Sequence, residues 1–143
     1  MPSWAPETTV AYWINRASRV LMRTHEERLR PLGFGMGQLP VLLALEDGAE
    51  LSQKELAARA RVEQPTMAQA LTRMERDGLL ERRPNPNDAR SSLYSLVRGA
   101  RAKLPQLKTA LLQGDSEACA GLSAAERAQL IELLRRVAGN LEG

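Results

Sequence analysis

The 143-residue chain is poor in several residue types that particular functions need. It has one cysteine, Cys119, and one histidine, His25, so an internal disulfide is excluded and a zinc site built from His and Cys is disfavoured. Aromatic residues make up only 3% of the chain, too few for the platforms on which RNA and single-stranded DNA stack their bases. No apolar run approaches the roughly 20 residues that span a bilayer, and residues 1–7 lack the basic start and apolar stretch of a secretion signal. We therefore expect a cytoplasmic protein that does not enter a membrane.

Motifs of catalysis are missing as well. The sequence has no glycine-rich phosphate loop, no nucleophile elbow and no run of metal ligands. The adjacent acids Glu26 and Glu27 are typical of a solvated helix. We predict that the chain is not an enzyme and that it carries no cofactor and no metal.

The positive charge is concentrated in the middle of the chain. The formal net charge is +3, but residues 51–103 hold 11 Lys and Arg against 6 Asp and Glu, which gives this segment +5 and the remainder −2. A basic segment between slightly acidic ends favours contact of the middle with a polyanion, although basic segments are also common on ordinary surfaces.

Apolar periodicity predicts a long helix at the N-terminal side. Apolar residues recur at spacings of three and four over residues 7–32, and Pro31 and Gly33 end the pattern. After a glycine-rich break at residues 34–37, a second helix is expected to about Leu45.

Two boundary signals then predict a helix-turn-helix. Ser52 and Glu55 have the spacing of a capping box, which opens a helix to about residue 60. A turn follows, and Pro65 lies in the first turn of a helix that stops at Gly78. Two short helices joined by a tight turn are typical of this motif.

The pattern after Gly78 predicts a β-hairpin. Strands are expected at residues 79–83 and 92–97, with a polar, turn-rich loop at 84–91. This hairpin would form the wing of a winged helix-turn-helix.

Helices are expected again towards the C-terminal side. A helical segment is expected from about residue 99 to 112, with breaks at Gly114 and Asp115 and again at Gly121. A second capping box, Ser123 with Glu126, opens a last helix. The predicted fold class is mainly α with a small β-hairpin wing. It comprises an N-terminal dimerisation helix (1–34), a winged helix-turn-helix DNA-binding lobe (35–104) and C-terminal dimerisation helices (105–143).

Three stretches, in this order, resemble the MarR (multiple antibiotic resistance regulator) family. They are LSQKELA at residues 51–57, the segment 63–79 (close to the recognition helix of the SlyA-like branch) and the D-x-R of Asp88 and Arg90 in the wing. The resemblance implies a homodimer interlaced through its terminal helices, which binds a near-palindromic operator in double-stranded DNA as a transcriptional regulator and acts as a repressor. The apolar stripes of the terminal helices agree, because they exceed what a small winged core can bury.

The second helix of the motif has a polar face suited to reading bases. Thr66, Gln69 and Arg73 share that face at spacings of three and four, opposite Met67 and Leu71. An ordinary exposed face is the alternative. Gln69 stands where SlyA-like relatives have arginine, and glutamine pairs well with adenine, so the operator is expected to differ from theirs.

The wing and its surroundings supply the remaining candidate DNA contacts. Arg90 at the wing tip is expected to enter the minor groove, with Asp88 holding its guanidinium, unless it is a solvated loop arginine. Phosphate contacts are expected from four further basic residues, for each of which bare surface is the alternative. These are Lys54, Arg76, Arg82 and Arg83.

The resemblance also implies a pocket for a small aromatic or carboxylate effector beside the first helix. Tyr12, Trp13 and His25 are the candidates, although a tryptophan there more often packs in a core and a histidine more often lies at the surface. Cys119 does not match the reactive cysteine of the peroxide-sensing branch and is expected to be an inert, partly buried thiol. The alternative function is a winged-helix protein-interaction module that no longer binds DNA.

Overall fold

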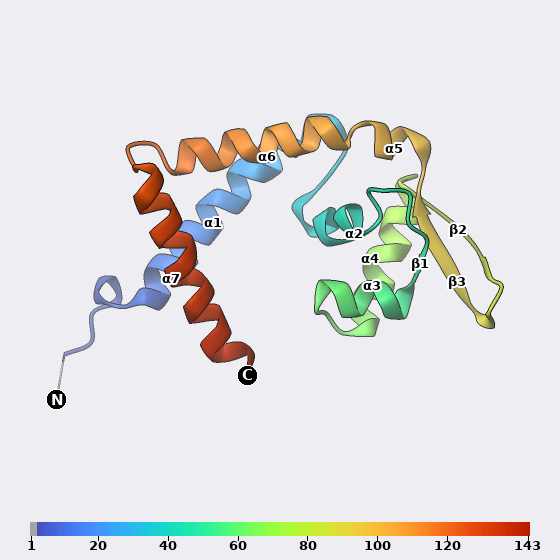
Figure 1. Cartoon of the computed structure of the whole chain (residues 1–143), viewed down its shortest axis with the longest axis horizontal. Helices are drawn as coiled ribbons and strands as arrows, with labels where there is room; N and C mark the ends of the chain where they lie inside the picture. Colours follow the sequence, from blue (N-terminus) through green and yellow to red (C-terminus); the bar gives the residue numbers. More distant parts are fainter. Residues whose placement is uncertain (1–2) are drawn as a thin grey trace.

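The computed structural model describes residues 3–143 and is mainly helical, with one three-stranded antiparallel sheet (Figure 1). Its elements in chain order are η1 (Pro6–Thr8), α1 (Val10–Leu29), η2 (Arg30–Leu32), η3 (Met36–Gln38), α2 (Leu39–Ala44), β1 (Leu51–Ser52), α3 (Gln53–Ala60), α4 (Gln64–Arg76), β2 (Leu80–Asn85), β3 (Asp88–Leu96), α5 (Arg98–Ala102), α6 (Leu104–Ala118) and α7 (Ala124–Glu142). The predicted fold class, a mainly α chain with a small β wing, is confirmed.

The elements fall into two groups in space. Residues 36–96, which we call the winged lobe, gather on one side of the molecule, while most of α1 and α7 lies on the other and α6 spans the two (Figure 1). Helix α6 packs along α1, and it leads from the lobe to the far end, where the chain turns back into α7 (Figure 1). No helix within residues 3–143 is long and apolar enough to cross a membrane.

Helix α1 begins and ends at the signals that the sequence carries. The Thr9 hydroxyl oxygen accepts the backbone N–H of Tyr12 at 3.2 Å and so caps the first turn. At the other end, Gly33 adopts a left-handed φ of 86°, which only glycine reaches without steric cost. The predicted long helix over residues 7–32 is therefore correct, with 3₁₀ turns at its two ends.

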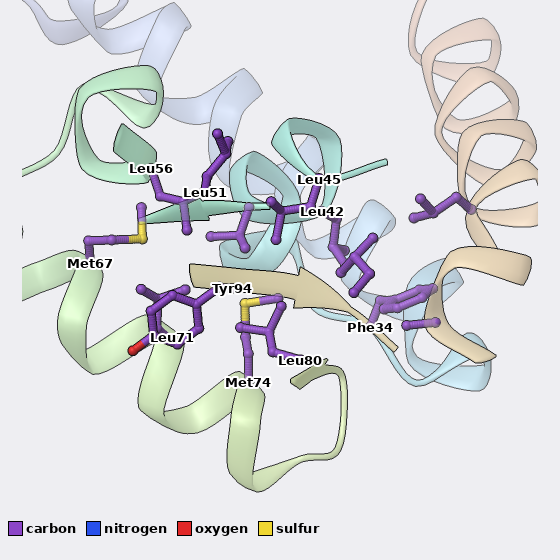
Figure 2. Close-up of a cluster of buried hydrophobic side chains, with 14 of the residues drawn as sticks. Phe34, Leu42, Leu45, Leu51, Leu56, Met67, Leu71, Met74, Leu80 and Tyr94 are labelled. Carbon is purple, nitrogen blue, oxygen red and sulfur yellow. The ribbon is translucent and has the colours of Figure 1, made fainter. Parts of the chain in front are cut away.

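A single apolar core joins the lobe to the end of α1 and the start of α6 (Figure 2). Leu29 of α1, Leu42 of α2 and Leu107 of α6 are fully buried. At roughly 1.5–3 kcal/mol for each fully buried large aliphatic side chain, this core is the main source of stability within one chain. It fixes where the lobe sits relative to α1 and α6.

The sheet differs from the predicted hairpin in two ways. The strands continue through most of the expected loop, so that only Pro86 and Asn87 lie between β2 and β3. The reason is that the polar residues of 84–91 are exposed on a two-stranded ladder, which needs no apolar alternation. In addition, β1 pairs with β3 next to the α3 cap, with Leu51 opposite Tyr94.

The break predicted at Gly114 and Asp115 is wrong, because α6 runs through both residues to Ala118. Gly114 is buried, and a Cβ built on it would lie 2.6 Å from Cδ2 of His25. The glycine therefore marks a close approach between α6 and α1, not a helix end.

Helix α7 has the clearest cap in the C-terminal half, yet it buries nothing within the chain. The Ser123 hydroxyl accepts the Glu126 N–H at 3.1 Å, and the Glu126 carboxylate accepts the Ser123 N–H at 2.8 Å. This predicted capping box is confirmed. No residue of the helix is buried, and Ile131 is 67% exposed.

Candidate nucleic-acid interface

The helix-turn-helix is fixed at its start by a capping box. Glu55 N–H donates to the Ser52 hydroxyl at 3.2 Å, and Ser52 N–H donates to the Glu55 carboxylate at 3.1 Å. The hydrogen bonds from the backbone and then the side chain of Ser52, with a smaller contribution from the charge of Arg59, lower the pKa of Glu55 despite partial desolvation. Glu55 is thus held ionised at the positive end of α3.

Helix α4 has one face locked in the core and another in solvent. Met67, Leu71 and Met74 are 3%, 1% and 1% exposed, and Figure 2 shows all three turned towards the sheet and the other lobe helices. Thr66 and Gln69 lie on the opposite, exposed side. Because three buried side chains set the rotation of the helix, its outer face is presented in a defined orientation.

The outer face of α4 holds more than the three residues predicted. Arg73 is exposed next to Gln69, as expected, and Arg76 extends the face by one turn. Thr72 is also exposed, and its hydroxyl donates to the Ala68 carbonyl at 2.9 Å, which holds the side chain in place on this face. Thr72 lies five residues from the buried Met67, on a different side of the helix. A full helical wheel would have placed it on the exposed face, whereas a search for spacings of three and four from Thr66 did not.

The turn between β2 and β3 is braced by short-range hydrogen bonds. The Asn85 side chain accepts the Asn87 N–H at 3.0 Å and donates to the Ser91 hydroxyl at 3.0 Å. The Asp88 carboxylate accepts the Arg90 N–H at 3.0 Å. These bonds shape the wing tip, from which Arg90 projects as an exposed side chain.

Asp88 does not hold the guanidinium of Arg90, as the sequence had suggested. Its carboxylate bonds the backbone amide two residues ahead, which is the usual geometry of a local Asp turn. Among residues 3–143, no carboxylate lies within 4.0 Å of the Arg90 guanidinium. The guanidinium is left with its charge available.

The four predicted phosphate-contacting residues differ in their surroundings. Arg82 forms an ion pair with Glu75 at 3.0 Å, and Arg83 forms one with Glu50. Arg76 lies 3.7 Å from the Asp77 carboxylate, whereas Lys54 has no ion-pair partner among residues 3–143. Of the predicted DNA-contacting residues, Lys54, Arg73 and Arg90 therefore carry charges that no carboxylate of residues 3–143 offsets within 4.0 Å.

Tyr12 and Trp13 form a small aromatic cluster at the start of α1. The rings are 5.1 Å apart and edge to face, and the Arg16 guanidinium lies 5.4 Å from the Trp13 ring centre. The Trp13 indole N–H donates to the Glu7 carbonyl at 2.9 Å, but the side chain is still 51% exposed. Trp13 is not packed in the core of the chain.

His25 lies elsewhere and in the opposite environment. It is only 8% exposed, packed against Gly114 of α6, and its Nε2 has no hydrogen-bond partner. Twelve residues of helix separate it from Trp13, about 18 Å along the axis. The three predicted effector-binding residues therefore do not share one pocket within the chain.

Two grooves lie along α1 and α6, and neither is lined by Tyr12, Trp13 or His25. One, of about 470 Å³, is lined by Arg28, Leu112 and Glu117 among others, and a second, of about 380 Å³, lies between Arg28 and Pro105. Arg28 pairs with Glu117 and also donates to Gln113 at 3.3 Å. Cys119 at the end of α6 is partly buried, as predicted.

A family model and several curated relatives match the chain. A model described as "MarR family" matches residues 32–91. The HTH-type transcriptional regulator YwoH of Bacillus subtilis (strain 168) is 28% identical over 122 residues, which cover 85% of this chain and 88% of YwoH.

Solved structures extend the match to nearly the whole chain. Wild-type MarR from E. coli in its apo form is 30% identical, with 90% of this chain and 96% of that chain covered and a TM-score of 0.71. A mutant MarR from E. coli complexed with operator DNA is 29% identical, with 90% of this chain and 92% of that chain covered and a TM-score of 0.81. The agreement covers the α1, α6 and α7 side of the molecule as well as the winged lobe.

Proposed function

Because this chain belongs to the MarR family of winged helix-turn-helix transcriptional regulators, we propose that it binds a near-palindromic operator as a homodimer and represses transcription. The observation that carries this proposal is the outer face of α4, where polar side chains stand opposite three buried ones. A helix held in this way can enter the major groove of DNA without losing its own packing. The crystallised complex of E. coli MarR with operator DNA supports duplex DNA as the ligand.

The homodimer part of the proposal rests on α7. Leu130, Leu133 and Leu134 of this helix are 43%, 44% and 42% exposed, although they recur at helical spacing on one side. A second copy of the chain would cover them, and a two-fold pair of lobes would match a near-palindromic site.

The roles of the DNA-facing residues follow from their chemistry. Thr66, Gln69 and Arg73 would contact base edges or phosphates in the major groove, with Gln69 best suited to adenine. This face lies in the segment that resembles the SlyA-like branch, to which we assign the chain within the family.

The wing would bind beside the recognition helix. Arg90 would reach the minor groove, where the negative potential of a narrow groove attracts a guanidinium, while Asp88 shapes the turn that presents it. Lys54 would contribute most to phosphate binding, and Arg76, Arg82 and Arg83 less, because these three already have carboxylates nearby.

A pair of variants tests these roles. Arg90→Ala should weaken binding to all operator variants alike and reduce the slope of log K against log salt by about one unit for each half-site. Gln69→Ala should leave that slope unchanged and relax the preference at one base pair in each half-site by about 1–3 kcal/mol.

The measurement is a set of titrations at several salt concentrations, on the operator and on its single-base variants. Unchanged base preference in Gln69→Ala would show that α4 does not read sequence through this face. Wild-type protein that binds no genomic fragment in a salt-dependent way would instead favour a protein-interaction module.

We also propose that a small aromatic carboxylate weakens operator binding. The Tyr12–Trp13 cluster offers an aromatic surface, and Arg16 beside it offers a guanidinium for a carboxylate. Titration of the protein–operator complex with salicylate-like compounds should release the DNA, whereas an unchanged affinity across a broad panel would mark a constitutive binder.

A further inference from the structure

The basic residues of the chain fall into two classes, those that face a carboxylate and those that do not. Of its 20 Lys and Arg residues, nine lie within 4.0 Å of a carboxylate, which leaves eleven without one among residues 3–143. Lys54, Arg73 and Arg90, in the winged lobe, belong to the second class. Outside the lobe and α5, most of the basic residues without a nearby carboxylate lie on α1 or directly after it.

Four of the unpaired residues line one face of α1. We call them the arginine stripe: Arg16, Arg19, Arg23 and Arg30. Their spacings of three, four and seven keep them on one side of a helix, and Arg30 continues the helical φ and ψ of α1. All four are exposed, on the side away from the buried His25 and Leu29.

The carboxylates near the stripe leave most of its charge uncompensated. Glu26 is occupied, because its Oε1 accepts the Met36 N–H at 2.6 Å. Arg28 and its partner Glu117 lie at the α6 side of the helix. Glu26 and Glu27 both border the stripe, but neither lies within 4.0 Å of its guanidinium groups, and Arg16 is also in contact with the Trp13 ring.

Helix α7 differs from α1 in how its arginines are paired. Its three arginines are all paired, Arg127 with Asp115 at 3.0 Å, and both Arg135 and Arg136 with Glu132. A row of arginines with no carboxylate within 4.0 Å is therefore found on α1 and not on α7.

We propose that the arginine stripe binds the phosphate backbone of the same DNA duplex that the winged lobe holds. The stripe spans about 14 residues of helix, or about 21 Å, which matches about six phosphates along one strand. Arginine suits phosphate through its paired N–H groups. The lobe would raise the local concentration of DNA beside α1, so that even weak contacts would form.

The position of the stripe relative to the lobe supports the shared duplex. Glu26, three residues after Arg23 and four before Arg30 and so beside the stripe, reaches the loop at Gly35 and Met36 that enters the lobe. The stripe therefore borders the side of α1 that looks towards the lobe. This inference rests on the proposed DNA-binding function and adds to it a second surface of contact.

The test compares two double variants that remove the same charge. Arg19→Gln with Arg23→Gln removes half of the stripe, and Arg135→Gln with Arg136→Gln removes two paired arginines of α7. The first should reduce the salt slope of operator binding by about 1.8 for each chain on the duplex, with equal loss on every base variant. The second should keep the wild-type slope. Thermal unfolding of both variants checks that the fold is kept.

Two outcomes would overturn the proposal: an unchanged slope in the stripe variant, or an equal reduction in both variants. If the slope is unchanged and the stripe variant also loses the binding to immobilised poly-glutamate that the wild type shows, the stripe belongs instead to an acidic protein partner. If the wild type binds the operator and Gln69→Ala relaxes its base preference while the stripe variant behaves as wild type, only the stripe fails. If the wild type shows no sequence preference at all, the proposed function fails with it.

Discussion

The winged lobe and helix α7 both carry apolar side chains, but they differ in how far the chain itself shields these from water. The lobe buries its apolar side chains within one chain, where Leu42, Leu56 and Leu71 are 0%, 1% and 1% exposed. Helix α7 has 19 residues and a complete capping box, yet none of its residues is buried. A helix of this length gains most of its stability from packing an apolar face. The apolar core of the lobe is therefore covered within the single chain, whereas the apolar side of α7 is not. The proposed homodimer would supply the surface that covers it.

The largest expected effect comes from placing a charge in the apolar stripe of α7. Leu134→Asp would leave a carboxylate unpaired in the seam between two chains, at a cost of several kcal/mol, or on the order of 100-fold or more in dimer dissociation. Sedimentation should then show chains of 15.8 kDa. The lobe should stay folded, with the NMR signals of its backbone amides kept.

A matched charge on the other side of α7 serves as the control. Ala128→Asp lies among exposed polar residues in the first turns of the helix, where a negative charge is tolerated. It should sediment as wild type does. A dimer that survives Leu134→Asp would show that the stripe is not the seam.

The second expected effect lies at the contact between α1 and α6. Gly114→Ala would bring a methyl group to 2.6 Å from Cδ2 of His25, and overpacking of this kind costs about 1–3 kcal/mol. This outweighs the gain of up to about 1 kcal/mol from replacing a helical glycine with alanine. Thermal or denaturant unfolding should therefore show a net loss of stability.

Gly99 of α5 provides the control for this substitution. A Cβ there would meet no atom within 4 Å, so Gly99→Ala should be neutral or slightly stabilising. Equal responses at the two glycines would mean that His25 yields easily and that the α1–α6 contact is loosely packed.

The third expected effect separates the two capping boxes. Ser52→Ala removes a cap beside the core and should cost about 1 kcal/mol of global stability. Ser123→Ala removes the equivalent bond from α7, so its cost should appear as faster amide exchange in α7 and weaker dimerisation, with the lobe unchanged. Slower folding or lower stability of the lobe in Ser123→Ala would contradict the separation.

The smallest expected effect is a pH dependence confined to the lobe cap. The hydrogen bonds from Ser52 lower the pKa of Glu55 in the folded chain, so the stabilisation is fully present above the pKa of the unfolded chain and is lost as the pH falls through the folded value. Glu55→Gln should flatten this acid limb of the stability curve slightly. The check is chemical denaturation between neutral and acidic pH, compared with the wild type.

The elements predicted well from the sequence are those with local signals. The two capping boxes, Pro65 at the start of α4 and the glycine at the end of α1 act through residues three or four positions away, so the sequence alone contains the whole interaction. The exposed positions of Thr66, Gln69 and Arg73 followed from the periodicity that also buries Met67.

The features that could not be predicted from the sequence depend on contacts between residues far apart in the chain. Gly114 resembles a helix breaker until His25, 89 residues earlier, is seen to pack against it. The same contact buries His25, while Trp13, expected in a core, is exposed because the chain alone offers it no cover. The strand lengths of the wing were underestimated because solvent-exposed ladders carry no apolar alternation.

The central claim is that two chains bind one operator, and the mass of the protein–DNA complex tests it most directly. Sedimentation equilibrium of the protein with one short operator duplex measures how many chains the DNA holds. On an operator with both half-sites we predict two chains, a protein mass of twice 15.8 kDa. On a scrambled duplex of equal length we predict no stable complex of this mass. One chain on the intact operator, or equal binding to the scrambled duplex, would contradict it.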